Sequence, residues 1–204
     1  MHKQRPIVLR AVPEPSVLPE LGAVDPVCAR LYASRGVTSV AELKYVLAGL
    51  APVSSLDNIA AAVELLEAHR DRRIVIVGDF DVDGATSTAL MLRCLRAFGF
   101  GDVDYLVPNR FDYGYGLTPE IVRVAAERQP SLIVTVDNGI SSDACVDESK
   151  QLGIAVMVTY HHFQGAEVPD ADVIVNPNLG GSQFPSPNLA GVGVAFYVMA
   201  ALGR

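Results

Sequence analysis

The sequence of 204 residues predicts an α/β protein with a doubly wound, mostly parallel five-stranded sheet and a small helical N-terminal preface. From residue 73 onward, short β-branched runs alternate with longer stretches of helical periodicity. This alternation is typical of right-handed crossovers and of a parallel sheet covered by helices on both faces. Half of the residues are hydrophobic, which is enough for one substantial core.

The chain before residue 73 is expected to form two segments. Residues 1–24 are rich in proline and predict an extended arm, whereas residues 25–72 carry apolar side chains at helical spacing and predict a preface of three helical segments. Residues 73–204 then form the α/β domain. The final helix is almost wholly apolar and needs cover, so we expect the chain to be the front part of a longer protein.

The α/β domain is expected to place polar side chains at one edge of its sheet. Strands are predicted near residues 74–78, 103–107, 132–136, 154–159 and 172–175, with helices near 86–98, 118–128, 142–152 and 188–202. Ligands bind beyond the carboxyl ends of the strands in such sheets. The polar groups that follow the five strands are Asp79 to Asp83, Asn109 with Arg110, Asp137 with Asn138, His161 with His162, and Asn176 with Asn178.

Composition limits the functional classes. No apolar stretch approaches the roughly 20 residues of a membrane span, and the first residues lead into no signal-peptide region, so a cytoplasmic location without a membrane partner is expected. The cysteines Cys28, Cys94 and Cys145 are odd in number and widely spaced, which indicates reduced core residues. The net charge of −7 argues against a polyanionic partner unless bound cations offset the acids locally.

The loop of residues 78–87 carries Asp79, Asp81 and Asp83 at alternate positions, before a helix expected to start near Thr86. Carboxylate oxygens are hard ligands that suit Mg²⁺ or Mn²⁺. The alternative is a solvated turn in which one aspartate caps the helix. Three carboxylates within five residues repel one another unless a cation binds, which favours the metal site. The loop lacks the lysine of a phosphate loop and the glycine spacing of a dinucleotide fingerprint.

Asp137 and the paired histidines follow the third and fourth strands. Asp137 lies in an Asp-Asn-Gly sequence that is common in turns, but its place beside the acidic loop favours a ligand role. If His161 and His162 are both extended, their side chains point in different directions, so one would bind the metal and the other would face a phosphate. An imidazole ligand favours Mn²⁺ over Mg²⁺.

The loop of residues 108–119 is a candidate phosphate site. Arg110 can grip a phosphate with two hydrogen bonds, and Gly114 and Gly116 allow the backbone to approach a ligand. Alternatively, Arg110 pairs with an acid of the same loop or the next helix. The loop aromatics, including Tyr115, could stack on bases or pack beneath the loop. The glycines of residues 189–195 favour a tightly packed helix start over a dinucleotide loop.

With these residues in view, the chain resembles the DHH phosphoesterase superfamily, and within it the exonucleases that are specific for single-stranded DNA. The resemblance runs from about Leu31 to the end. Its motifs are VGDFDVDGATS at 77–87, VPNR at 107–110, GYG at 114–116, VDNGIS at 136–141 and LAGVGVAF at 189–196.

The resemblance implies a 5′→3′ exonuclease of DNA repair and recombination that depends on two Mn²⁺ or Mg²⁺ ions, which activate water for in-line attack on phosphorus. It implies metal ligation by Asp81, Asp83, Asp137 and His161, with Asp79 adjacent and His162 near the scissile phosphate. Substrate-binding residues would be Asn109, Arg110, Gly114, Tyr115, Gly116, Asn138 and His162, with Arg110 on the 5′-phosphate. The expected partners are single-stranded DNA with a 5′-phosphate, a single-strand-binding protein and a helicase.

One departure concerns the Asp-His-His signature, which reads Tyr160, His161 and His162 here. The acid expected to orient the first histidine is missing, and loss of such a partner typically costs about 10–100-fold in metal affinity or activity. The family's fourth acidic motif should lie beyond Arg204. We therefore expect little or no nuclease activity from these 204 residues alone.

Two other functions fit part of the pattern. A haloacid-dehalogenase-like phosphatase would use Asp81 as nucleophile and Asp83 as acid–base, but would not use the histidines as metal ligands. A degenerate DHH module, marked by Tyr160, would bind nucleic acid without turnover.

Overall fold

The computed structural model describes residues 8, 11, 24–44, 46–114, 116–139, 143–163 and 168–204, except for the side chains of Arg110 and Asp143. The chain divides into two compact units, Met1–Leu50 and Ala51–Arg204. The extended arm predicted for residues 1–24 lies almost entirely outside the described residues. The predicted division at residues 24 and 72 stays a proposal.

The described residues of the first unit form one α-helix and two short 3₁₀ turns. Helix α1 (Pro26–Ala33) begins after Asp25, whose side chain accepts a hydrogen bond from the Val27 backbone N–H, and Pro26 occupies its first turn. The 3₁₀ turns η3 (Val40–Leu43) and η4 (Leu47–Gly49) follow, so the expected middle helix of the preface consists of short turns. Ala33 is the buried residue of a small apolar cluster in this unit.

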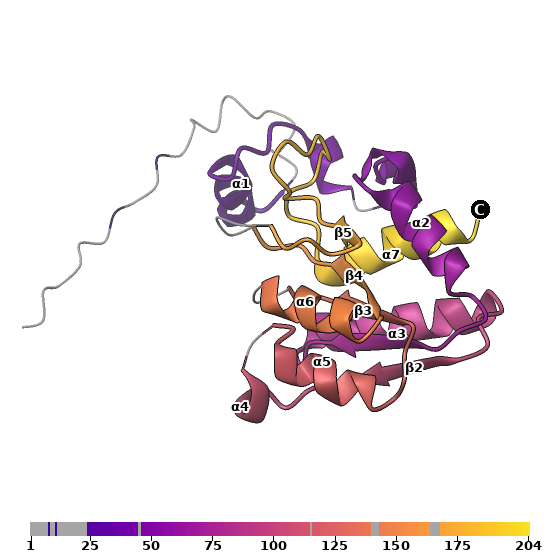
Figure 1. Ribbon diagram of the computed structural model, residues 1–204. Coiled ribbons are helices and arrows are strands. Elements are labelled where there is room, and N and C mark those ends of the chain that lie inside the picture. The colour runs from indigo at the N-terminus through magenta and orange to yellow at the C-terminus, as the bar shows by residue number, and fades with distance from the viewer. Residues whose placement is uncertain are drawn as a thin grey trace, which may run out of the picture. The chain divides into compact units, whose positions relative to one another are not determined.

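The second unit is an α/β fold with one five-stranded sheet in the order β2-β1-β3-β4-β5, and every described strand pair is parallel (Figure 1). Its strands are β1 (Ile74–Gly78), β2 (Val103–Leu106), β3 (Leu132–Val136), β4 (Ala155–Thr159) and β5 (Val173–Val175). Its helices are η5 (Val53–Ser55), α2 (Ile59–Ala68), α3 (Val82–Ala97), α4 (Arg110–Tyr113), α5 (Pro119–Ala126), α6 (Asp143–Gln151) and α7 (Gly191–Leu202). The predicted α/β class and parallel sheet are confirmed.

Alternate residues of the strands supply two separate cores. Ile74 and Ile76 of β1 belong to a core that includes residues of α2, α3 and α7, whereas Val75 and Val77 belong to a core that includes residues of α5 and α6. All five residues of β1 are buried because helices cover both of its faces. The sheet is therefore doubly wound, as predicted.

Local structure departs from the sequence prediction at three places. Helix α3 begins at Val82, four residues earlier than expected, because Asp81 caps its first turn. The loop after β2 contains the short helix α4, which the sequence analysis did not predict. The prediction of three core cysteines is wrong for Cys28, which is exposed, while Cys94 is half-buried and Cys145 buried.

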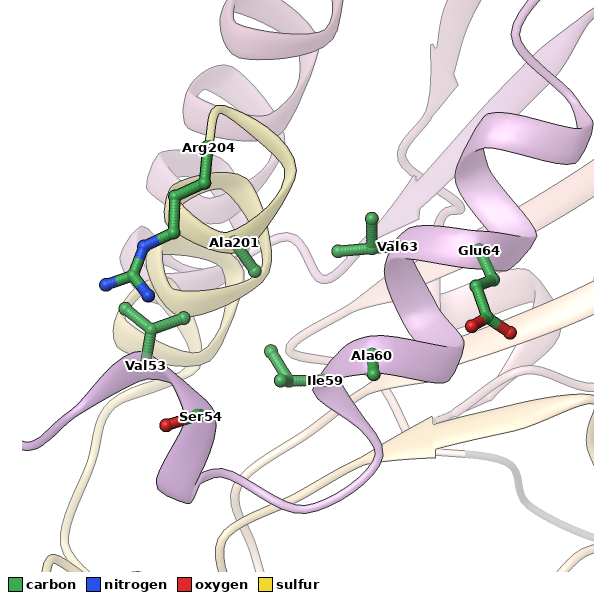
Figure 2. Close-up of a pocket in the computed structure, with 8 residues that line it drawn as sticks. All are labelled: Val53, Ser54, Ile59, Ala60, Val63, Glu64, Ala201 and Arg204. Carbon is green, nitrogen blue, oxygen red and sulfur yellow. The ribbon is translucent and has the colours of Figure 1, made fainter.

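An apolar pocket lies between η5, α2 and the C-terminal end of α7 (Figure 2). Its lining includes Val53, Ile59, Val63, Ala201 and Arg204, and its volume is about 310 Å³. None of the predicted site residues that the structure describes lines it. Among the described residues, no helix is both long and apolar enough to cross a membrane.

Candidate metal centre

The strand order reverses around β1 and β3, and carboxylates follow both strands at that point. Gly78 at the end of β1 pairs with Val136 at the end of β3. The backbone pairing continues one residue further, since the Asp79 N–H donates to the Val136 carbonyl and the Asp137 N–H donates to the Thr159 carbonyl. Asp79 and Asp137 thus leave adjacent strands at the switch point where ligands bind in doubly wound sheets.

The acidic loop is fixed by short-range hydrogen bonds. Asp81 accepts the Gly84 N–H at 2.9 Å as the N-cap of α3, and Asp79 accepts the Phe80 N–H at 2.8 Å. Gly84 packs directly against the backbone of Asp79, because an added Cβ would lie 2.4 Å from the Asp79 carbonyl oxygen. Glycine at position 84 therefore lets α3 begin close to the end of β1.

Asp83 connects the acidic loop to the start of α7. Its two carboxylate oxygens accept the backbone N–H groups of Gly191 and Val192 at 2.8 and 2.7 Å. These donors are unpaired within a helix and carry its positive dipole end, so they stabilise a carboxylate. The glycine motif of residues 189–195 is the packed helix start that the sequence predicts, but its contact with Asp83 could not be read from either segment.

Asp137 is held in an unfavourable environment. Its backbone is left-handed, with φ of 53°, and its side chain is 5% exposed. Its Oδ1 is buried and accepts no hydrogen bond, although His161 Nε2 lies 3.0 Å away. Burial, followed by the charges of Asp83, Asp81 and Asp79, raises the pKa of Asp137 to about 7. A divalent cation would relieve both the desolvation and the repulsion.

His161 presents Nε2 to the carboxylates. This atom lies 3.0 Å from Asp137 Oδ1 and 3.7 Å from Asp83 Oδ2. Burial and the charge of His162 lower the pKa of His161, while Asp83 and a hydrogen bond to the Leu189 backbone act in the opposite direction. The lowered pKa favours the neutral imidazole, which is the form that binds a metal.

The backbone that carries the histidines is anchored from the end of β5. Asn178 donates to the His161 carbonyl at 2.6 Å, and Asn176 donates to the His162 carbonyl at 2.9 Å. The Tyr160 hydroxyl lies 2.7 Å from His162 Nδ1. The two asparagines, which the sequence analysis placed at the sheet edge without a role, thus hold the histidine segment.

Two overlapping groups of side chains could hold an ion. One contains Asp79, Asp81 and Asp137, and the other contains Asp137, His161 and His162, with the ligand atoms of each group within 4.8 Å of one another. Carboxylate oxygens and imidazole nitrogen suit Mn²⁺, and the oxygens suit Mg²⁺. The buried Oδ1 of Asp137, which accepts no hydrogen bond, fits a cation at this point.

The geometry differs from the sequence prediction in two respects. Asp79 joins the first group, whereas Asp83, a predicted ligand, belongs to neither group and contacts α7 instead. The two histidine side chains, which would diverge if both residues were extended, reach the same group, and their ring centroids are 4.4 Å apart. The reason is that β4 ends at Thr159, so residues 160–162 do not follow the alternation of a strand.

The predicted substrate-binding residues lie in two places. Asn138 is buried next to Asp137, and its Oδ1 has no hydrogen-bond partner. Asn109 donates to Asp112 at 2.6 Å and accepts the Phe111 N–H, which caps the start of α4. Gly114 and Gly116 have positive φ values of 78° and 86°. Tyr115 and the side chain of Arg110 lie outside the described residues.

Known proteins resemble this chain in sequence. The single-stranded-DNA-specific exonuclease RecJ of Salmonella typhimurium is 53% identical over 204 residues, which are 99% of this chain and 35% of that protein. The Escherichia coli protein of the same name is 52% identical over 204 residues, with the same coverage. The chain therefore spans about a third of the length of these curated relatives.

Solved structures resemble the fold, and a family model matches the sequence. A crystal structure of RecJ with Mn²⁺ from Thermus thermophilus is 33% identical, with a TM-score of 0.70 over 94% of this chain and 27% of that one. Another, of exonuclease RecJ bound to manganese, is 36% identical, with a TM-score of 0.66 over 75% of this chain and 39% of that one. The model of the DHH family, N-terminal domain, matches residues 73–204. The chain belongs to the DHH family.

Proposed function

We propose that this chain carries the metal-binding portion of a 5′→3′ exonuclease that hydrolyses phosphodiester bonds of single-stranded DNA in DNA repair and recombination. The observation that carries the proposal is the convergence of Asp79, Asp81, Asp137, His161 and His162 at one edge of the sheet. The relatives named as single-stranded-DNA-specific exonucleases, and the manganese in the similar structures, support the substrate and the cofactor.

The proposed ligands of Mn²⁺ or Mg²⁺ are Asp81, Asp83, Asp137 and His161, to which the geometry adds Asp79. Asp83 stays among them although it accepts two backbone N–H groups, because each carboxylate oxygen has a second lone pair. Divalent ions bound at this site would offset much of the charge of its carboxylates. The acidic net charge of −7 is therefore compatible with a polyanionic substrate.

The protein's own groups would hold and orient the scissile phosphate. When bound, a divalent cation supplies Lewis-acid chemistry, which polarises phosphoryl oxygens and makes water more acidic. His161 presents Nε2 to the acids, and Asp137 would give up its proton on binding a cation. We assign phosphate and nucleotide binding to Asn109, Arg110, Gly114, Tyr115, Gly116, Asn138 and His162, with Arg110 as a clamp for the 5′-phosphate.

The wider setting follows from this reaction. A single-strand-binding protein and a helicase would supply accessible single strands with 5′-phosphate ends. A cytoplasmic location fits a DNA substrate. Membership of the DHH family argues against a haloacid-dehalogenase-like phosphatase.

Calorimetric titration with Mn²⁺ tests the metal site. We expect the 204-residue chain to bind Mn²⁺ and H161A to lose at least tenfold in affinity, because a direct ligand is removed. H69A is the matched control, since His69 lies at the end of α2 and its Nδ1 contacts the Leu65 carbonyl. Equal Mn²⁺ binding by wild type and H161A would overturn the proposed site.

A nuclease assay on 5′-phosphorylated single strands tests the reaction. We expect little or no hydrolysis by this chain, because Tyr160 replaces the signature acid and the chain spans a third of its relatives. Y160D should bind Mn²⁺ more tightly if an acid at this position supports the metal site. Robust Mn²⁺-dependent digestion by the wild-type chain would refute the expectation of low activity. Single-strand binding without metal or turnover in the full-length protein would favour a degenerate binding module.

A further inference from the structure

Tyr160, which stands where the family signature has an aspartate, is built into the site. Its hydroxyl lies 2.7 Å from His162 Nδ1, and the two ring centroids are 4.7 Å apart. Its ring packs against the core that contains Val158. An aspartate would be too short to combine this core contact with a hydrogen bond to His162 of the same geometry. The tyrosine therefore reaches the second histidine, although an acid was expected to orient the first.

Gly139 makes the position of the Tyr160 ring possible. A Cβ at residue 139 would lie 3.0 Å from Tyr160 Cε1 and 3.2 Å from Cζ, closer than ordinary contact. The ring is thus confined between the Asp-Asn-Gly turn on one side and the core on the other. On the other side of the histidine, Asn176 holds the His162 carbonyl at 2.9 Å. Asn176 therefore fixes the backbone of His162, and Tyr160 contacts its imidazole.

We propose that Tyr160 is a positioning residue whose hydroxyl donates to Nδ1 of His162 and so selects the tautomer with a proton on Nε2. This proposal rests on the proposed phosphodiester chemistry of the site. A phenol is neutral at pH 7 and is a better donor than acceptor, whereas the unprotonated imidazole nitrogen is a good acceptor. With its proton on Nε2, neutral His162 has no lone pair there for a metal ion.

The tautomer decides what His162 can do at the sheet edge. His162 lies within reach of the same ion as Asp137 and His161. With Nδ1 occupied by Tyr160 and Nε2 protonated, His162 is a hydrogen-bond donor to a phosphate oxygen and stands outside the ligand set. Tyr160 would thus separate the roles of two adjacent histidines, with His161 facing the metal and His162 facing the substrate.

Imidazole ¹⁵N spectra of the metal-free 204-residue chain at pH 8 test the proposal directly. We expect the Nε2–H tautomer of His162 in wild type and a mixture of tautomers in Y160F, which retains the ring but lacks the hydroxyl. G139A, which displaces the ring and keeps the hydroxyl, should give the same mixture. Y105F is the matched control, because Tyr105 is 49% exposed on β2 and should leave His162 unchanged.

A spectrum of His162 that is identical in wild type and Y160F would overturn the proposal, as would an Nδ1–H tautomer in wild type. A second measurement uses a 5′-phosphorylated single-stranded oligodeoxynucleotide with Mn²⁺. Loss of the positioning bond should weaken the binding of this oligonucleotide to Y160F by about three- to tenfold. The tautomer measurement needs neither metal nor DNA, so its outcome is independent of whether the proposed function holds.

Discussion

At the scale of single residues, Asp137 carries the strongest unfavourable interactions of the site. Its carboxylate is buried, lies among three other acids and has a pKa raised to about 7. Its backbone is left-handed, a conformation that aspartate tolerates better than most residues but that still costs free energy. Such conditions persist where the surrounding fold fixes them and a ligand relieves them.

The raised pKa of Asp137 gives the metal-free chain a distinctive pH dependence. Its folded pKa lies above the usual unfolded value of about 3.9, so the folded state binds more protons between about pH 4 and pH 7. The free energy of unfolding should therefore fall as the pH rises through this range. The slope from Asp137 should reach at most about 1.4 kcal/mol per pH unit, measured by urea unfolding in the presence of a chelator.

D137N is the control, because an amide of the same shape does not titrate. His161 acts with the opposite sign, since its lowered pKa makes the free energy of unfolding rise with pH below the usual histidine pKa of about 6.5. The difference between wild type and D137N isolates the carboxyl group. Parallel curves for the two proteins would contradict a raised Asp137 pKa.

Metal binding should release the Asp137 proton. At pH 6 the metal-free carboxyl group is mostly protonated, so Mn²⁺ must displace close to one proton, whereas at pH 8 it displaces few. Calorimetry in two buffers of different ionisation enthalpy measures this number. Heats that are independent of the buffer at pH 6 would show that the group is already ionised.

Gly191 tests how closely α7 approaches the acids. An added Cβ would lie 2.6 Å from Asp137 Oδ1, so G191A should displace the carboxylate or the helix start. We expect a loss of about 1–3 kcal/mol in the free energy of unfolding and weaker Mn²⁺ binding. G101A is the matched control, since no atom lies within 4 Å of its added Cβ. Equal stability of the two variants would show that the close contact is tolerated.

At the scale of elements, the site depends on how α3 and α7 begin. Both helices start beside the edge of the sheet where the strands end. Asp81 caps the start of α3, and the first backbone N–H groups of α7 donate to Asp83. Hydrophobic periodicity predicted both helices, but it placed the start of α3 four residues late, because apolar spacing says little about the polar first turn. The Asp83 bonds to α7 were beyond prediction, since they join residues 108 and 109 positions apart.

D83A tests the link between the two helices. Removing the carboxylate leaves two backbone N–H groups at the start of α7 without their partners, which should cost about 2–4 kcal/mol in the free energy of unfolding. The free energy should be measured at pH 5. Asp137 is mostly protonated there, so removing the Asp83 charge relieves little repulsion between the two carboxylates. D71A, a change at an exposed acid, is the control. A loss of the same small size in both variants would argue against the anchor.

At the scale of the whole molecule, the sequence was sufficient for the α/β class, the parallel strands and the edge at which the polar residues gather. These follow from periodicity and from the rule that ligands lie beyond the carboxyl ends of parallel strands. The contacts among the side chains at this edge of the sheet could not be predicted from the sequence. The convergence of His161 with His162 depends on where β4 ends, and the contact of Tyr160 with His162 depends on space at Gly139.

Metal binding should stabilise the entire fold, since its ligands come from the ends of three strands. At a free Mn²⁺ concentration a hundredfold above the dissociation constant, the gain should be about 2.7 kcal/mol. It should appear as a rise in Tm that H161A largely loses and H69A retains. An unchanged Tm with saturating Mn²⁺ would mean that the unfolded chain binds the ion equally well.

The bonds between Asp83 and the start of α7 also set an order of events during synthesis. Asp83 leaves the ribosome more than a hundred residues before Gly191 and Val192, which donate these hydrogen bonds. Until those residues emerge and α7 docks, the acidic loop lacks its long-range anchor. The nascent chain would therefore hold an incompletely formed metal centre, which becomes ordered only when α7 has been made.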